Sequence, residues 1–229
     1  KEVVYDAEHF FDGYRANPAY ALDTLQAAYE SGADCLCLCD TNGGSFPDFV
    51  QSVTRLVLER FPVAVGIHAH DDAGMAAANS VLAVAAGATH VQGTLAGFGE
   101  RCGNANLSTV LAGLQLKLGH DCVPADALER LTSTVHEVAD ISNISVGKNM
   151  PYVGANAFAH KGGMHVDGVM KNSLSFEHVS PSAVGNSRRV MLSEVAGRSA
   201  ILEKVKGFCP EIRKDSAEAA MIIDMVKQM

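Results

Sequence analysis

Four short apolar segments, separated by helical patterns, constrain the fold of this chain more than any other feature. The segments are EVVYD (2–6), DCLCLCD (34–40), VAVGIHAH (63–70) and HVQGTL (90–95). Each is continuous in apolar or small residues, a pattern typical of parallel strands that are covered on both faces. They start about 25 to 30 residues apart, enough for a strand, a helix and two short loops. The sequence therefore predicts consecutive βα units of a right-handed parallel sheet.

Apolar residues at helical spacing fill the intervals between these segments and continue beyond them. Two of the predicted helices stop at a glycine, Gly32 and Gly87, as helices commonly do. A region rich in Gly, Asn, Ser and Pro is predicted to be looped over 142–181, and the tail over 193–229 to form two helices. The helices predicted before the tail, including the two that stop at Gly32 and Gly87, cover 17–32, 46–60, 74–87 and 107–118, and a further one runs from Pro124 to about residue 141.

Four βα units fit either a doubly wound sheet or half of a (β/α)₈ barrel. No GxGxxG follows the first segment, and polar residues gather where the strands end, as they do in barrel enzymes. We therefore predict an α/β fold: the C-terminal half of a (β/α)₈ TIM barrel over 1–142, then a small, mainly helical linker subdomain over 143–229. The chain has no initiating Met and runs straight into a strand, so we expect it to start within a domain.

The composition favours a globular protein that acts on small molecules. Of 229 residues, 48% are hydrophobic and the net charge is -8, with scattered Lys and Arg, which argues against a nucleic-acid partner. No apolar run approaches the roughly 20 residues of a membrane helix. The six cysteines include no CxxC pair, which favours packing in a reducing cytoplasm over a disulfide framework.

The segment HAHDD ends an apolar strand with two histidines. Side chains two residues apart in a strand share a face, so His68 and His70 both point inward if the strand reaches His70. Imidazole is the commonest transition-metal ligand, and Asn104 at the next strand end offers an oxygen. We expect Asp71 to point away and Asp72 to cap the following helix. The alternative is one histidine in the core and the other in a loop.

The segment HAHDDAG also matches the H-x-H-[N/D]-D-x-G signature of the isopropylmalate, homocitrate and citramalate synthase family, which are metal-dependent Claisen-condensing TIM barrels. Further segments resemble that family in the same order, to about residue 200, and DAEHFFDGY and CDTNGG are most similar to its citramalate synthase branch. These segments are YDAEHFFDGYRANPAYAL, LCDTNGG, VQGTLAGFGERCGNANL, NAFAHKGGMHVDGVMKN and FEHVSPSAVGNSRR.

The resemblance implies a metal site and a substrate contact. His68, His70 and Asn104 would bind a divalent metal (Mg²⁺, Mn²⁺ or Zn²⁺) with an aspartate from an N-terminal RDG motif that this sequence does not contain. The metal would act as a Lewis acid on the carbonyl of a 2-oxo acid. Thr41 would hydrogen-bond the carboxylate of that acid.

The resemblance also implies the proton chemistry and the reaction. Glu8 and His165 match the catalytic glutamate and histidine, the latter commonly presented across a homodimer, and a base is needed to deprotonate acetyl-CoA. The implied activity is condensation of acetyl-CoA with pyruvate to (R)-citramalate, in isoleucine biosynthesis. We expect residues 1–229 alone to be inactive.

Two positions depart from the family pattern and keep alternatives open. Phe176 stands where a tyrosine is usual, and its ring has no hydroxyl to donate; Ala155 stands where Glu is commoner. One alternative is an isopropylmalate or homocitrate synthase, which differs in the oxo acid. Others are a metal-dependent lyase or carboxyltransferase of the same superfamily, and a non-catalytic paralogue or fragment.

Overall fold

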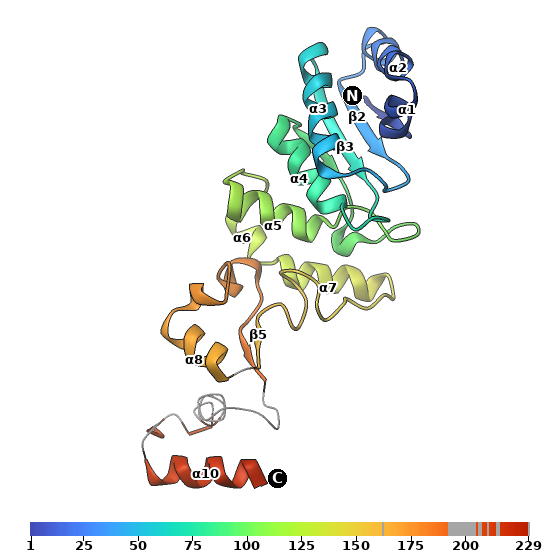
Figure 1. The fold of residues 1–229 in the computed structure, drawn as a ribbon. Helices are drawn as coiled ribbons and strands as arrows, with labels where there is room; N and C mark the ends of the chain where they lie inside the picture. The colour runs from blue at the N-terminus through green and yellow to red at the C-terminus, as the bar shows by residue number, and fades with distance from the viewer. Residues whose placement is uncertain (162, 192–204, 206–207, 210, 214–215, 229) are drawn as a thin grey trace. The chain divides into compact units, whose positions relative to one another are not determined.

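The four predicted strands form one parallel sheet (Figure 1). Its order is β1-β2-β3-β4, so each strand pairs with the next one along the chain. A doubly wound sheet would reverse its order at a switch point, whereas a barrel segment does not. The predicted α/β class with barrel-like strand order is confirmed. The strands are β1 (Val4–Ala7), β2 (Cys35–Asp40), β3 (Ala64–Ala69) and β4 (His90–Gln92).

The computed structural model describes residues 1–161, 163–191, 205, 208–209, 211–213 and 216–228. The chain divides into two compact units, 1–123 and 124–229. The domain boundary predicted from the sequence lies later, after residue 142, and that domain division stays a prediction.

The helices of the first unit follow the predicted ranges, with one addition. Helix α1 was not predicted, because seven residues are too few to display a helical period; it buries Phe10 and Phe11. The side chain of Asn17 begins the next helix by accepting a hydrogen bond from the N–H of Tyr20. The helices are α1 (Phe10–Ala16), α2 (Pro18–Glu30), α3 (Pro47–Arg60), α4 (Ala76–Ala86) and α5 (Leu107–Leu118), with a 3₁₀ turn, η1 (Leu95–Gly97).

The two faces of the sheet differ in chemistry. On one face, Leu36, Leu38, Val65 and Ile67 are fully buried and form one core cluster with residues of α1 to α4. The other face carries the alternate positions of the register. These include Asp6, Cys37, His68, His90 and Gln92.

A hydrogen bond across that second face shows that the sheet is curved. The Nε2 of Gln92 on β4 donates to Oδ1 of Asp6 on β1 at 2.8 Å, although the two residues are 86 positions apart in the sequence. In a flat sheet, three strand spacings would separate these strands by about 14 Å, beyond the reach of the two side chains. The polar face is therefore concave, like the inside of a barrel wall.

The second unit departs from the predicted pattern at two places. The helix predicted from Pro124 to about 141 is wrong as one helix, because it is interrupted at Glu129 and Arg130. The region predicted as looped contains a helix, α8. The elements are α6 (Ala125–Leu128), α7 (Leu131–Ile141), β5 (Ala159–His160), α8 (Gly163–Lys171), η2 (Ser173–Ser175), η3 (Pro181–Val184), β6 (Arg189–Val190) and α10 (Ala217–Gln228).

Strands β5 and β6 pair in parallel. Helix α10 matches one of the two helices predicted over 193–229, and much of the rest of that range lies outside the described residues. Within the described ranges, no helix has the length and apolar character needed to cross a membrane.

A buried ion network holds the second unit together. Glu177 is only 3% exposed. It accepts hydrogen bonds from Nε and Nη2 of Arg188 at 2.7 and 2.6 Å, and its Oε1 lies 3.0 Å from Nε2 of His160. The Arg188 guanidinium holds the pKa of the Glu177 carboxyl below its ordinary value of 4.5.

We expect Glu177→Gln to lower the free energy of unfolding by about 2 kcal/mol at pH 7, because charge-assisted hydrogen bonds to Arg188 become weaker neutral ones. A carboxyl with a lowered folded-state pKa stabilises the fold above its ordinary pKa of 4.5, and this contribution is lost as the pH falls below that value. Urea unfolding at pH 7 and pH 3 measures both effects. The exposed Glu137→Gln on α7 is the matched control, and an equal loss for both variants at pH 7 would contradict the prediction.

Candidate active site

The structure brings His68 and His70 together at the end of β3. Their ring centroids lie 5.2 Å apart, and the two Nε2 atoms are separated by 3.4 Å. The strand itself ends at Ala69, but His70 continues its direction through an isolated bridge to Asn104. Both imidazoles therefore occupy the same end of the concave face.

Asn104 is held beside His70 by a tightly folded loop. Its N–H donates to the carbonyl of Gly97 at 3.1 Å, and its Nδ2 donates to the carbonyl of Phe98 at 3.0 Å. Gly103 has φ +99°, and a Cβ there would overlap the carbonyl oxygen of Gly97. A glycine is required at this position for the loop to deliver Asn104.

These three residues fit a divalent cation. In the described part of the chain, Oδ1 of Asn104 is among the buried polar atoms without a hydrogen-bond partner. Leaving such an atom unsatisfied costs about 1–3 kcal/mol, so a ligand from outside the chain is expected there. The 3.4 Å between the Nε2 atoms also matches two ligands of one tetrahedral ion with bonds of about 2.0–2.1 Å.

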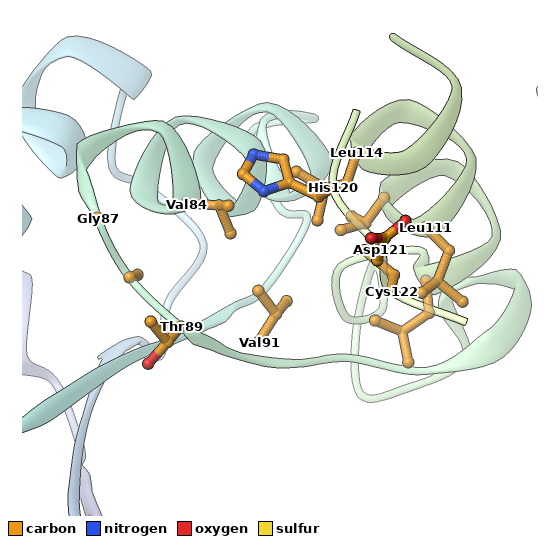
Figure 2. Close-up of a pocket in the computed structure, with 12 residues that line it drawn as sticks. Val84, Gly87, Thr89, Val91, Leu111, Leu114, His120, Asp121 and Cys122 are labelled. Atoms are coloured by element: carbon orange, nitrogen blue, oxygen red, sulfur yellow. The ribbon is translucent and has the colours of Figure 1, made fainter. Parts of the chain in front are cut away.

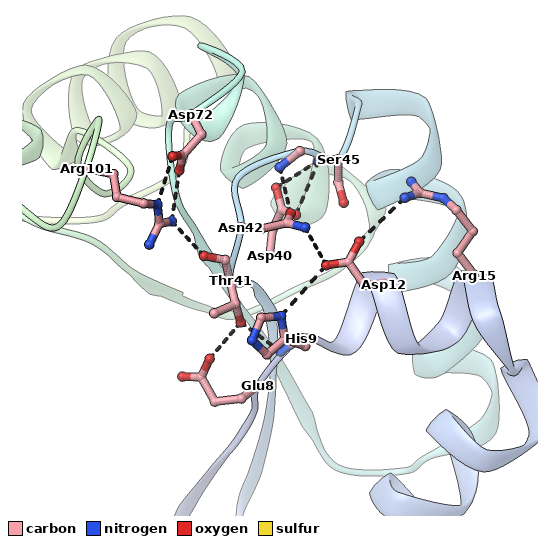
Figure 3. Close-up of polar contacts among 11 residues, drawn as sticks. Glu8, His9, Asp12, Arg15, Asp40, Thr41, Asn42, Ser45, Asp72 and Arg101 are labelled. Carbon is pink, nitrogen blue, oxygen red and sulfur yellow. Dashed lines mark hydrogen bonds and ion pairs between the residues drawn. The ribbon is translucent and has the colours of Figure 1, made fainter.

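Glu8 and Thr41, which follow neighbouring strands, are in direct contact (Figure 3). The hydroxyl of Thr41 donates to Oε2 of Glu8 at 2.6 Å and accepts from the N–H of His9 at 2.7 Å. Thr41 therefore orients the Glu8 carboxylate. The resemblance implied a separate role for each residue, and this bond was not predicted from the sequence.

Arg101, in the loop after β4, connects that loop to the strand ends that carry Thr41 and Asp72. This contact was not predicted from the sequence. Arg101 forms a two-point ion pair with Asp72 at 2.8 and 2.9 Å and donates from Nη2 to the carbonyl of Thr41 (Figure 3). The guanidinium lowers the pKa of the Asp72 carboxyl. The signal was present in the sequence as GERCGN, but the bond depends on how two loops fold together.

The expected role of Asp72 is corrected by the structure. Asp72 does not cap the following helix. Oδ1 of Asp71 does so, by accepting from the N–H of Ala76 at 2.9 Å. The chain turns at Gly74 with φ +72°, and this turn places Asp71 rather than Asp72 over the start of α4.

Three residues near the strand ends that carry the candidate site have strained backbone. His9, Ala96 and Arg101 are non-glycine residues with φ of 55°, 60° and 56°. His9 follows β1, while Ala96, in η1, and Arg101 follow β4. Left-handed conformations of such residues cost about 1–3 kcal/mol and cluster at functional sites, which supports this edge as the site.

The concave face also carries a group that the sequence analysis had not assigned to the site. Donor atoms of Asp6, Cys37 and Cys39 lie within 4.8 Å of one another. All six cysteines of the chain are free thiols in the structure, and burial raises the pKa of Cys35. Cys35, Cys37 and Cys39 of β2 are buried and pack as small apolar side chains.

His165 belongs to the second unit, on α8. Its ring stacks on Phe176, with centroids 4.4 Å apart and an interplanar angle of 25°. Both side chains are exposed. Phe176 therefore supplies a stacking surface for the imidazole without the hydroxyl that a tyrosine would add.

A cavity of about 660 Å³ lies on the helical side of the sheet, between α4, β4 and α5 (Figure 2). Its walls include Val84, Val91, Leu111 and Leu114, with His120 at its polar part. The lining contains none of the predicted site residues, so the cavity is separate from the candidate site.

Comparison with known proteins identifies the family to which this chain belongs. The HMGL-like family model matches residues 2–141, and a model described as homocitrate synthase post-HMGL domain-like matches 152–229. The chain belongs to the HMGL-like family.

Individual proteins with curated functions are similar to this chain over its whole length. The chain is 52% identical over 229 residues to an (R)-citramalate synthase of Aquifex aeolicus and 48% identical over 238 residues to one of Synechocystis sp.. Each match covers 100% of this chain and 43% of the relative, so the chain spans less than half the length of these relatives. A solved HMG-CoA lyase of Bacillus subtilis has a TM-score of 0.48 and 26% identity, over 56% of this chain and 44% of that one. The predicted resemblance is confirmed, since (R)-citramalate synthases are similar to this chain over its whole length.

Proposed function

We propose that this chain is part of an acyltransferase that condenses acetyl-CoA with pyruvate and hydrolyses the thioester, giving (R)-citramalate and CoA. The observation that carries the proposal is the pair of facing imidazoles, His68 and His70, beside the unsatisfied oxygen of Asn104. The (R)-citramalate synthases at 52% and 48% identity support the choice of substrates. We further propose a cytoplasmic homodimer that serves isoleucine biosynthesis.

His68, His70 and Asn104 are proposed to hold a divalent cation, Mg²⁺, Mn²⁺ or Zn²⁺. A neutral imidazole nitrogen and an amide oxygen are donors that suit such ions. When bound, the cation supplies Lewis-acid polarisation of the oxo acid's carbonyl. Thr41 is proposed to contact the carboxylate of the oxo acid, and its single hydroxyl hydrogen would then turn from Glu8 to the substrate.

Glu8 and His165 are proposed to move the protons. The methyl group of acetyl-CoA loses a proton to a base, its carbon bonds to the keto carbon of pyruvate, and the resulting oxygen anion is protonated. Before the oxo acid binds, the Thr41 hydroxyl holds one oxygen of Glu8, which leaves the other carboxylate oxygen of this exposed residue to exchange a proton. His165, exposed on α8, supplies the second group. The resemblance favours its delivery across a dimer interface.

The test is CoA release by the complete protein from acetyl-CoA, with pyruvate, 2-oxoisovalerate or 2-oxoglutarate, in a series of divalent metals. We expect release with pyruvate, and its loss on chelation. Release only with 2-oxoisovalerate or 2-oxoglutarate would replace the proposal by an isopropylmalate or homocitrate synthase. Metal binding without release for any oxo acid would favour a non-catalytic paralogue.

A further inference from the structure

We propose that Gln92, anchored by Asp6, is a positioning residue that sets the tautomer of His68, so that its Nε2 lone pair is presented to the cation. This inference rests on the proposed metal site and goes beyond it, because it names residues that act on a ligand without touching the metal. Its basis is a hydrogen-bonded chain that crosses the concave face from β1 to β3.

The chain of contacts has two measured links. Nε2 of Gln92 donates to Oδ1 of Asp6 at 2.8 Å, and Oε1 of Gln92 lies 2.9 Å from Nδ1 of His68. Gln92 and His68 are register partners on neighbouring strands, so their side chains emerge side by side. Asp6 reaches the amide only because the sheet is curved.

These links determine where the proton of His68 sits. A carboxylate can only accept hydrogen bonds, so the amide of Gln92 must turn its NH₂ group toward Asp6. Its oxygen then faces His68 and can only accept. Nδ1 of His68 must therefore carry the hydrogen, and the neutral ring has its lone pair on Nε2.

The bare nitrogen of His68 faces the imidazole of His70, the second proposed metal ligand. Nε2 of His68 lies 3.4 Å from Nε2 of His70. An imidazole with a hydrogen on Nε2 could not bind a metal through that atom. Partners that fix the ring of a metal-binding histidine typically change metal affinity by 10–100-fold when they are mutated.

Three variants of the complete protein test this hydrogen-bonded relay from Asp6 through Gln92 to His68. Gln92→Leu removes the acceptor, and we expect the dissociation constant for Mn²⁺ or Zn²⁺ to rise 10–100-fold by titration calorimetry. The double variant Asp6→Asn with Gln92→Glu exchanges the groups: the carboxylate introduced at position 92 accepts from both Nδ1–H of His68 and the new amide at position 6, so affinity is expected to recover. Gln26→Leu, which breaks another glutamine–carboxylate contact, to Glu30 on α2, is the matched control.

The tautomer is read independently of metal and activity. In ¹⁵N-histidine-labelled, metal-free protein, NMR is expected to show hydrogen on Nδ1 of His68, and a mixture of tautomers in Gln92→Leu. Hydrogen on Nε2 in the unaltered protein, or a metal affinity of folded Gln92→Leu within twofold of it, would overturn the relay. If the unaltered protein bound no metal, the proposed function would fail, while the tautomer measurement would still decide the relay.

Discussion

Replacing His70 with alanine is expected to abolish metal binding at concentrations that saturate the unaltered protein, and to lower kcat about 10³-fold. The reason is that His70 supplies one of the two facing imidazoles, 3.4 Å from that of His68. Lewis-acid activation of a carbonyl contributes several kcal/mol, and about 4 kcal/mol corresponds to 10³ in rate. Calorimetry and CoA release measure the two effects.

The exposed His120→Ala is the matched control, because it removes an imidazole from the same unit outside the proposed metal-binding residues. It should retain both metal binding and turnover. A folded His70→Ala protein that still bound the metal with unchanged affinity would exclude His70 as a ligand. Circular dichroism and the unfolding midpoint establish that the variant is folded.

Glu8→Gln is expected to lower kcat by about 10²–10⁴-fold while the metal dissociation constant stays unchanged. Removing a general acid or base typically has an effect of this size. The glutamine keeps the shape of Glu8 and can still accept from the Thr41 hydroxyl, but it cannot take up a proton. The change therefore separates proton transfer from the packing of this loop.

Two controls sharpen the Glu8 result. Glu59→Gln, an exposed change on α3, should leave kcat unaltered. Exchange of the acetyl-CoA methyl protons with D₂O, followed by NMR, should slow in Glu8→Gln if Glu8 removes the proton. A kcat within tenfold of the unaltered protein would assign the proton transfer to another group, with His165 the first to be tested.

Local sequence signals were reliable where a single element decided the outcome. Helix α5 has the predicted bounds, Leu107–Leu118, because Asn106 begins it and Gly119 ends it within the same short segment. The break between α6 and α7 was missed, because it lies where Gly185, more than 50 residues later, packs against the carbonyl of Glu129. The pattern of residues 124–141 contains no sign of that contact.

In the candidate site, too, local features were predicted correctly and features that depend on tertiary contacts were not. The HxH spacing placed His68 and His70 on one face, since the two-residue period of a strand is a local property. The helix cap was assigned to Asp72 instead of Asp71, because a turn at Gly74 and the position of Arg101 decide which carboxylate reaches the start of α4. The amino acids alone do not define that geometry.

The sequence by itself determined the parallel βα order, the helices with local start and stop signals, and the family to which the chain belongs. Periodicity, capping residues and collinear motifs act over a few neighbouring residues, so they can be recognised without coordinates. Only the tertiary structure decided that Thr41 holds Glu8, that Arg101 joins Asp72 to the Thr41 loop, and that Asp6 orients Gln92 behind His68. Those contacts depend on the curvature of the sheet and the paths of separate loops, which arise when distant segments pack together.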